Sequence, residues 1–264
     1  MSGADPAAPP IIQVEHLEAR YGDNVILQDI NCEVRRGEIF VIVGGSGSGK
    51  TTLMRHMIGL LRPPVGRVLI EGEDIAHADE AERQRIQRRL GVTFQAGALF
   101  GSLTLGQNVA LPLEEYTALA PDTIQLLVRI KLAMVKLGGF EAYMPAELSG
   151  GMKKRAAVAR ALALDPSILF FDEPSAGLDP IISVELDELI LQLNKSLGAT
   201  MVVVSHELAS IFTIATRCIM IDSEAKNIIA DGDPRQLRDH STDPRVHAFF
   251  NRRPTDQAQR RSPA

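Results

Sequence analysis

Residues 44–51 decide the fold, and they read Gly44-Gly45-Ser46-Gly47-Ser48-Gly49-Lys50-Thr51. The stretch fits G-x-x-x-x-G-K-[ST], and it stands between an apolar strand-like run and a helical pattern over residues 50–61, as that motif requires. Glycines let backbone N–H groups curl around a β-phosphate, and the start of the helix adds its positive dipole. Lys50 is expected to reach the β- and γ-phosphates, the Thr51 hydroxyl to bind Mg²⁺, and Thr52 to complete the nucleotide contacts. The alternative is a flexible Gly/Ser turn with an incidental lysine.

Short strand-like runs lead into this loop, and turn residues at Gly22-Asp23 and Arg36-Gly37 separate them. They indicate an antiparallel β region that feeds the buried strand before the loop. The expected strands up to this point are residues 11–14, 25–27, 30–34 and 38–43.

Strands and helices alternate on both sides of a mostly helical stretch, residues 95–163. Before it we expect a strand at 67–70, a helix at 79–90 and a strand at 91–94; within it, a helix at 121–137. After it we expect strands at 167–171, 200–205, 217–221 and 227–230, and helices at 181–197 and 207–215. The predicted fold is α/β with an antiparallel β subdomain and an inserted α-helical subdomain. With the phosphate loop between a strand and a helix, its core resembles that of a P-loop NTPase, which implies a RecA-like core.

The composition is that of an ordinary globular protein, with 45% hydrophobic and 23% charged residues among 264. A net charge of -5 argues against nucleic acid as the main partner, which needs a basic surface. Cys32 and Cys218 lie far apart in apolar stretches, and we expect two buried thiols. No apolar run has the length of a membrane-spanning helix, and the first ten residues lack the basic region of a secretory signal.

Two carboxylates end the apolar run of residues 168–171. Such a run is typical of a strand covered on both faces in a parallel sheet, and ligands bind beyond the carboxyl ends of such strands. Asp172 is expected to hold Mg²⁺ through water and Glu173 to accept a proton from the attacking water, because a carboxylate committed to a cation is a poor base. Without the phosphate loop, the pair would more often be a solvated loop or a helix cap.

The sequence Leu148-Ser149-Gly150-Gly151-Met152, followed by a helix over residues 153–164, resembles the signature of ATP-binding-cassette ATPases. Further motifs of that family stand in the same order along residues 11–230. They are an aromatic residue before the phosphate loop (Tyr21), a glutamine after a strand (Gln95), the Asp172-Glu173 pair, the stretch from Ser175 to Asp179, and a histidine after a strand (His206).

The resemblance implies roles for these residues. Tyr21 would stack on adenine, Gln95 would sense Mg²⁺ and the γ-phosphate, and His206 would donate to the γ-phosphate. The catalytic set would then be Glu173, His206, Gln95 and Lys50, and Mg²⁺ would be held by Thr51, Gln95 and Asp172. Without the resemblance, Tyr21 would be interpreted as a half-buried strand residue, Gln95 as a surface residue and His206 as a residue with a structural role.

The signature loop is implied to act on a second subunit. Ser149, Gly150 and Gly151 would close on the γ-phosphate of an ATP molecule held by the partner's phosphate loop. One cassette per chain therefore implies a head-to-tail homodimer with two ATP molecules at its interface. Asp179 would lie at that interface and couple the two sites.

Three features indicate a subfamily of these ATPases: Met152 where many importers have glutamine, the apolar run at 96–104, and the sequence around Asp243. Together they resemble the ATPase of bacterial Mla-type (MCE-associated) phospholipid transport systems. Such a subunit would lie peripherally on the cytoplasmic face of the inner membrane, bound to integral-membrane permease subunits and, in the same complex, an MCE-type periplasmic protein. A small-solute importer and a soluble cassette ATPase, as in iron–sulfur cluster assembly, remain alternatives. The expected domains are a disordered lead at 1–10, the ATPase domain at 11–240 with its helical subdomain at about 96–163, and a partly disordered extension at 241–264.

Overall fold

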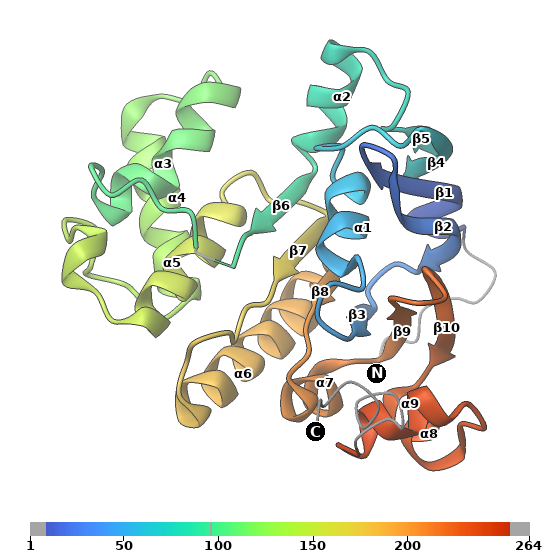
Figure 1. Ribbon diagram of the computed structural model, residues 1–264. Coiled ribbons are helices and arrows are strands. Elements are labelled where there is room, and N and C mark those ends of the chain that lie inside the picture. Colours follow the sequence, from blue (N-terminus) through green and yellow to red (C-terminus); the bar gives the residue numbers. More distant parts are fainter. Residues whose placement is uncertain (1–8, 96, 254–264) are drawn as a thin grey trace.

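The computed structural model describes residues 9–95 and 97–253. The disorder expected of the N-terminal lead falls mainly on residues 1–8, outside the described part, and so do Ala96 and residues 254–264 of the expected extension. The described chain forms a central sheet, a smaller antiparallel sheet and a group of helices set to one side (Figure 1).

The central sheet contains six strands in the order β10-β9-β3-β8-β7-β6. Neighbouring strands run parallel except for the β9–β10 hairpin. The predicted α/β class with a parallel core is confirmed. The strands are β3 (Ile39–Gly44), β6 (Leu90–Thr93), β7 (Ile168–Asp172), β8 (Thr200–Val204), β9 (Arg217–Asp222) and β10 (Asn227–Gly232).

Every residue of β3 is buried, because the sheet is covered on both faces. Ile39, Val41 and Val43 belong to a core shared with the helices α3 to α7, whereas Phe40 and Ile42 belong to a core shared with the antiparallel sheet and α1. Side chains alternate between the faces of a strand, so an uninterrupted apolar run supplies both cores at once.

The antiparallel sheet has the order β2-β1-β4-β5, formed by β1 (Ile12–Tyr21), β2 (Asn24–Val34), β4 (Val65–Ile70) and β5 (Glu73–Asp74). The prediction of separate strands at 25–27 and 30–34 is wrong, because β2 is continuous. Its pairing with β1 passes through register shifts, and Asp29 adopts a left-handed backbone with φ 52°. A bulged strand tolerates such residues without ending.

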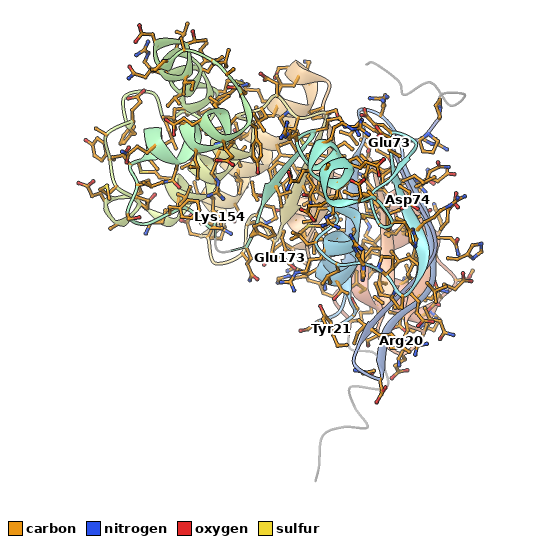
Figure 2. All side chains as sticks on the ribbon, turned by 90° about the horizontal axis from the view of Figure 1, so that it is seen from above. Arg20, Tyr21, Glu73, Asp74, Lys154 and Glu173 are labelled. Carbon is orange, nitrogen blue, oxygen red and sulfur yellow. The ribbon has the colours of Figure 1, made fainter. Side chains whose placement is uncertain are left out.

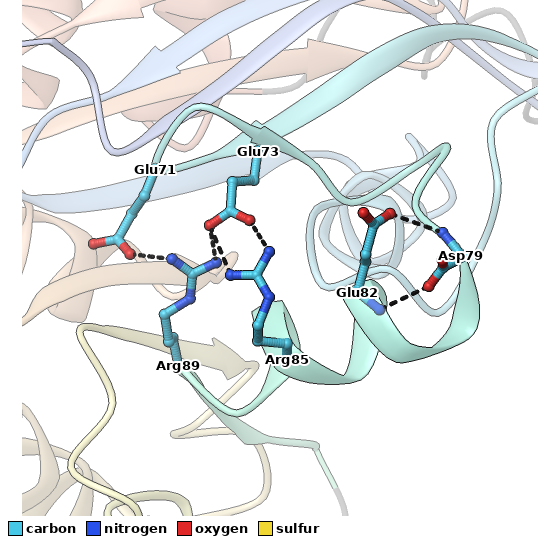
Figure 3. Close-up of polar contacts among 6 residues, drawn as sticks. All are labelled: Glu71, Glu73, Asp79, Glu82, Arg85 and Arg89. Carbon is cyan, nitrogen blue, oxygen red and sulfur yellow. Dashed lines mark hydrogen bonds and ion pairs between the residues drawn. The ribbon is translucent and has the colours of Figure 1, made fainter.

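Two helices connect the sheets, α1 (Lys50–Met57) and α2 (Glu80–Gln87). Asp79 caps α2 by accepting from Glu82 N at 2.9 Å, and the Glu82 carboxylate accepts in return from Asp79 N. At the other end, Arg89 bridges Glu71 and Glu73 at 2.8 and 2.7 Å, and Arg85 also pairs with Glu73 (Figure 3). These ion pairs fasten α2 to the antiparallel sheet.

The chain leaves the central sheet after β6 and returns at β7, its neighbour. Between them lie α3 (Leu105–Tyr116), α4 (Pro121–Met134), a short 3-10 helix (Pro145–Glu147) and α5 (Gly150–Ala161), which pack on one another beside the sheet (Figure 1). This inserted helical group agrees with the predicted fold class.

The remaining helices are α6 (Pro180–Leu197), α7 (Leu208–Ile214), α8 (Pro234–His240) and α9 (Pro244–Phe250). The last of these is firmly attached: Val246 and Phe250 are buried in the core, and the Arg245 guanidinium contacts the Asp222 carboxylate at 2.9 Å. Asp222 ends β9, the strand beside β3, so α9 is held next to the phosphate loop.

Candidate nucleotide-binding site

A cavity of about 730 Å³ opens beyond the carboxyl end of β3. Its wall brings together residues that are far apart in the sequence and that the motifs predict to act together. They are Tyr21, Ile26, Gly44, Gly45, Ser46, Gly47, Ser48, Gly49, Lys50, Thr51, Thr52, Gln95, Glu173, His206 and Phe249. The size and position are those expected for a ligand site at a parallel sheet.

Gly49 is the residue that allows the loop to turn directly into α1. It caps the helix in the left-handed region with φ 96°, and a Cβ there would stand 2.7 Å from Leu27 Cδ2. A larger residue would therefore be strained and would also collide with β2. The first turn of α1 consequently points its free N–H groups at the cavity, where they can bind phosphate.

Lys50 extends from this first turn back over the loop. Its Nζ donates to Gly44 O at 3.0 Å and to Gly45 O at 2.8 Å, and the residue is buried. Burial lowers the pKa of Lys50, while the nearby carboxylates of Glu173 and Asp172 act in the opposite direction. The ammonium group therefore lies at the cavity wall, held by two carbonyls and available to a phosphate.

The oxygen atoms expected to hold a divalent cation also lie together. Thr51 Oγ1 donates to Asp172 Oδ1 at 3.0 Å, and the Asp172 side chain is buried at the end of β7. Two further buried oxygens, Ser48 Oγ and Glu173 Oε2, have no hydrogen-bond partner among the described residues. Hydroxyl and carboxylate oxygens suit Mg²⁺, which binds through few protein ligands together with phosphates. The residues present thus fit the expected cation.

Glu173 and His206 form a pair at the edge of the cavity. His206 Nδ1 lies 2.8 Å from Glu173 Oε1, which leaves Oε2 unpaired. Glu173 adopts a left-handed backbone with φ 49°, and its N–H donates to Val204 O at 2.9 Å, so the ends of β7 and β8 fix its main chain. A non-glycine residue in this region stores strain, which is common at functional sites.

The signature residues lie elsewhere in the chain, and none lines this cavity. Ser149 is exposed and caps α5 by accepting from Met152 N at 3.2 Å, while a Cβ on Gly151 would stand 2.5 Å from Ile182 Cγ2. Asp179 caps α6 through Ile181 N at 3.0 Å. The structure therefore does not place Ser149, Gly151 or Asp179 at the phosphate loop of the same chain.

Two residues that line the cavity, Ile26 and Phe249, were not predicted from the sequence. Phe249 lines it from α9, a short helix that carries the aromatic pair Phe249-Phe250. Leu99, in the apolar run at 96–104, is partly buried and packs against the core. Phe100 is 51% exposed, with the Arg160 guanidinium 6.0 Å above its ring.

A strand, a phosphate-binding loop and a helix, with paired carboxylates at the end of another parallel strand of the same sheet, define the class of phosphate-loop ATPases. The chain belongs to the ABC transporter family, whose sequence profile matches residues 27–176. Within that family it is an ATP-hydrolysing subunit. No helix in the described residues has the length and apolar character needed to cross a bilayer.

Two relatives cover most of the chain. The intermembrane phospholipid transport system ATP-binding protein MlaF of Haemophilus influenzae is 42% identical over 91% of this chain and 90% of its own. The probable ribonucleotide transport ATP-binding protein mkl of Mycobacterium leprae is 40% identical over 92% of this chain and 69% of its own.

Solved structures of two cassettes are also similar. A dimeric post-hydrolysis state of the ATP-binding cassette MJ0796 bound to ADP and Pi has a TM-score of 0.76 at 29% identity, and the match covers 84% of this chain and 98% of that one. The cbiO1 protein of Clostridium perfringens has a TM-score of 0.80 at 29% identity, over 88% and 92% of the two chains.

Proposed function

We propose that this chain is the ATPase subunit of a transporter that moves phospholipid between the membranes of a bacterial envelope through a separate permease. The observation that carries the proposal is the 42% identity to MlaF, which extends over nearly the whole of both chains. The relative named for ribonucleotide transport is nearly as similar over this chain, but the match leaves about a third of that protein uncovered.

The geometry supports a distinct role in hydrolysis for each group of site residues. Tyr21 offers a half-exposed ring for the adenine base, and Lys50 with the N–H groups of residues 44–52 holds the phosphates. Thr51, Asp172 and Gln95 would hold Mg²⁺, which would supply positive charge to neutralise the phosphates. Glu173 accepts a proton from water as the water oxygen bonds to the γ-phosphorus and the bond to the bridging oxygen breaks, giving ADP and phosphate. His206 holds the Glu173 carboxylate and donates to the γ-phosphate.

The site is completed by a second copy of the chain. Ser149 and the N–H groups of Gly150 and Gly151 stand at the start of α5, a helix end that binds anions, yet they lie outside their own chain's cavity. A head-to-tail dimer would place them on the partner's γ-phosphate, with Asp179 at the interface. Dimeric cassettes of the same fold exist among the similar structures.

The permease would dock between the helical group and the core. A groove of about 220 Å³ lies there, bordered by Arg88, Tyr116 and Arg160, and Phe100 is exposed beside Arg160. Exposed aromatic and arginine side chains are the usual anchors of protein interfaces. Such docking would hold the chain on the cytoplasmic face of the inner membrane, in one complex with an MCE-type periplasmic protein.

The test is to purify the native complex through a tag on this chain and to identify its components by mass spectrometry. We expect a polytopic permease, an MCE-type protein and bound phospholipid. A permease with a solute-binding protein and no phospholipid would replace the proposal with a small-solute importer. Recovery of iron–sulfur assembly proteins without a membrane protein would overturn the transport role and leave the ATPase assignment standing.

A matched pair of variants tests the docking surface. Phe100→Glu places a charge in the proposed interface, whereas Leu126→Glu places one at an equally exposed leucine on α4. We expect Phe100→Glu to release the subunit from membranes with ATP binding intact, and Leu126→Glu to stay bound. Equal membrane binding of the two variants would contradict this docking surface.

A further inference from the structure

Helix α5 faces the loop that follows β6 with two cationic side chains. Arg160 donates to Ala98 O at 2.7 Å and to Gly97 O at 3.4 Å, and Lys154 Nζ donates to Gln95 O. Three carbonyls of one short loop are thus bound to the helix that begins at the signature sequence.

Lys154 makes a second contact, in the catalytic part of the core. Its Nζ also donates to Glu173 O at 3.3 Å, and Figure 2 shows Lys154 on the side of the helical group that faces Glu173. Gln95 and Glu173 follow β6 and β7, which are paired strands. One ammonium group therefore joins α5, the loop after β6 and the end of β7.

The peptide that Lys154 holds is one whose position matters. Glu173 has the strained φ of 49°, and its carbonyl also accepts from Ala176 N at 3.2 Å. Because the side chain leaves this same residue, a shift of the peptide moves the carboxylate relative to the cavity. Bonds from a cation to carbonyl oxygens are about twice as strong as neutral ones, so Lys154 can resist that shift.

Charge and burial also indicate that Lys154 holds the Glu173 peptide in place. Burial lowers the pKa of Lys154, while the Asp172 and Glu173 carboxylates act to raise it. The amine is thus a partly desolvated cation between two backbone carbonyls and close to both carboxylates of the site. A side chain that served only solubility would not be placed there.

We propose that Lys154 is a positioning residue that fixes the Glu173 peptide to the Gln95 loop and to α5, so that hydrolysis depends on where the helical group stands. The inference rests on the proposed role of Glu173 as the base. Movement of α5, whether imposed by the partner subunit or by a permease on the Gln95 loop, acts on Glu173 through this side chain.

The test compares three variants of the full chain. Lys154→Met removes both hydrogen bonds, Lys154→Arg retains a donor, and Lys153→Met is the matched control, since the structure describes no side-chain hydrogen bond for Lys153. We expect Lys154→Met to lower kcat about 10- to 100-fold, as for loss of hydrogen bonds to a charged group, with KM for ATP within about twofold of wild type. Lys154→Arg should restore most of the activity.

Two results would overturn the proposal: kcat of Lys154→Met equal to that of Lys153→Met, or a loss that appears in KM instead. If Lys154→Met does not fold, Lys154→Leu, which also lacks a donor, is measured with the same two outcomes. A single-turnover cycle with Glu173→Gln adds the decisive comparison. Lys154→Met should cost nothing further in that background, and an additive loss would show that it acts independently of Glu173.

The same cycle separates this inference from the proposed function. Full activity of Glu173→Gln alone would remove Glu173 as the base, whatever Lys154→Met does. A severe defect in Glu173→Gln together with a normal Lys154→Met would leave the base assignment intact and overturn only the positioning role.

Discussion

Replacing Glu173 with glutamine is the most informative single change at the site. Glutamine has nearly the same shape and can keep the contact with His206 Nδ1, which lies 2.8 Å from Oε1. What it removes is the basicity of Oε2, the buried oxygen with no partner among the described residues. The fold and the nucleotide contacts should therefore survive, and the loss should fall on proton transfer.

A positioned base contributes about 10²–10⁴ to a rate, equivalent to roughly 2.7–5.4 kcal/mol of activation free energy. We expect phosphate release by Glu173→Gln to fall by that factor while ATP affinity stays within about threefold of wild type. The variant should also accumulate as an ATP-bound dimer in size-exclusion chromatography. His206→Ala, which removes the group holding the carboxylate, should lower the rate by a smaller factor. Phosphate release by Glu173→Gln within a few-fold of wild type would refute the reasoning.

Three further predictions concern other parts of the molecule. Tyr21→Ala should raise KM for ATP about 5- to 150-fold, from the 1–3 kcal/mol of base–aromatic stacking, with kcat little changed and GTP still used; an unchanged KM would return Tyr21 to a structural role. Burial raises the pKa of the Cys32 and Cys218 thiols to about 12, so iodoacetamide at pH 8 should label neither in the native protein and both in guanidinium; rapid native labelling would contradict their burial. Phe250→Ala should lower the free energy of unfolding by about 3–5 kcal/mol because its ring is buried beside Phe212, and an unchanged denaturation midpoint would mean that α9 is not anchored as described.

The central sheet could be predicted from the sequence because its strands carry their own signals. Residues 39–43 and 168–171 are continuous apolar runs; the first leads into the glycine-rich loop and the second into two carboxylates, and both endings suit a ligand site. The motifs then predicted which side chains would meet. The structure confirms that Tyr21, the phosphate loop, Gln95, Glu173 and His206 line one cavity; their roles in the reaction remain predictions.

What the sequence could not show depends on contacts between distant segments. β2 continues through Gln28 and Asp29, two polar residues that suggest a break, because β1 pairs along it and Gln28 N donates to Lys226 O at 2.8 Å. Leu99 lies in an apolar run, and the sequence alone does not show which side chains of that run face the core. The position of Phe249 follows from the Asp222–Arg245 ion pair, which joins residues 23 positions apart.

The two-chain ATP site is the central claim, and mixed dimers test it most directly. One chain carries Lys50→Ala, the other carries Ser149→Arg, and each has a different tag so that only heterodimers are recovered by successive affinity steps. In a head-to-tail dimer both lesions fall in one site, and the other site keeps an intact Lys50 and Ser149. The account predicts that each mutant homodimer is inactive and that the heterodimer regains ATPase activity. Full activity of either mutant alone, or a heterodimer as inactive as both homodimers, would contradict it.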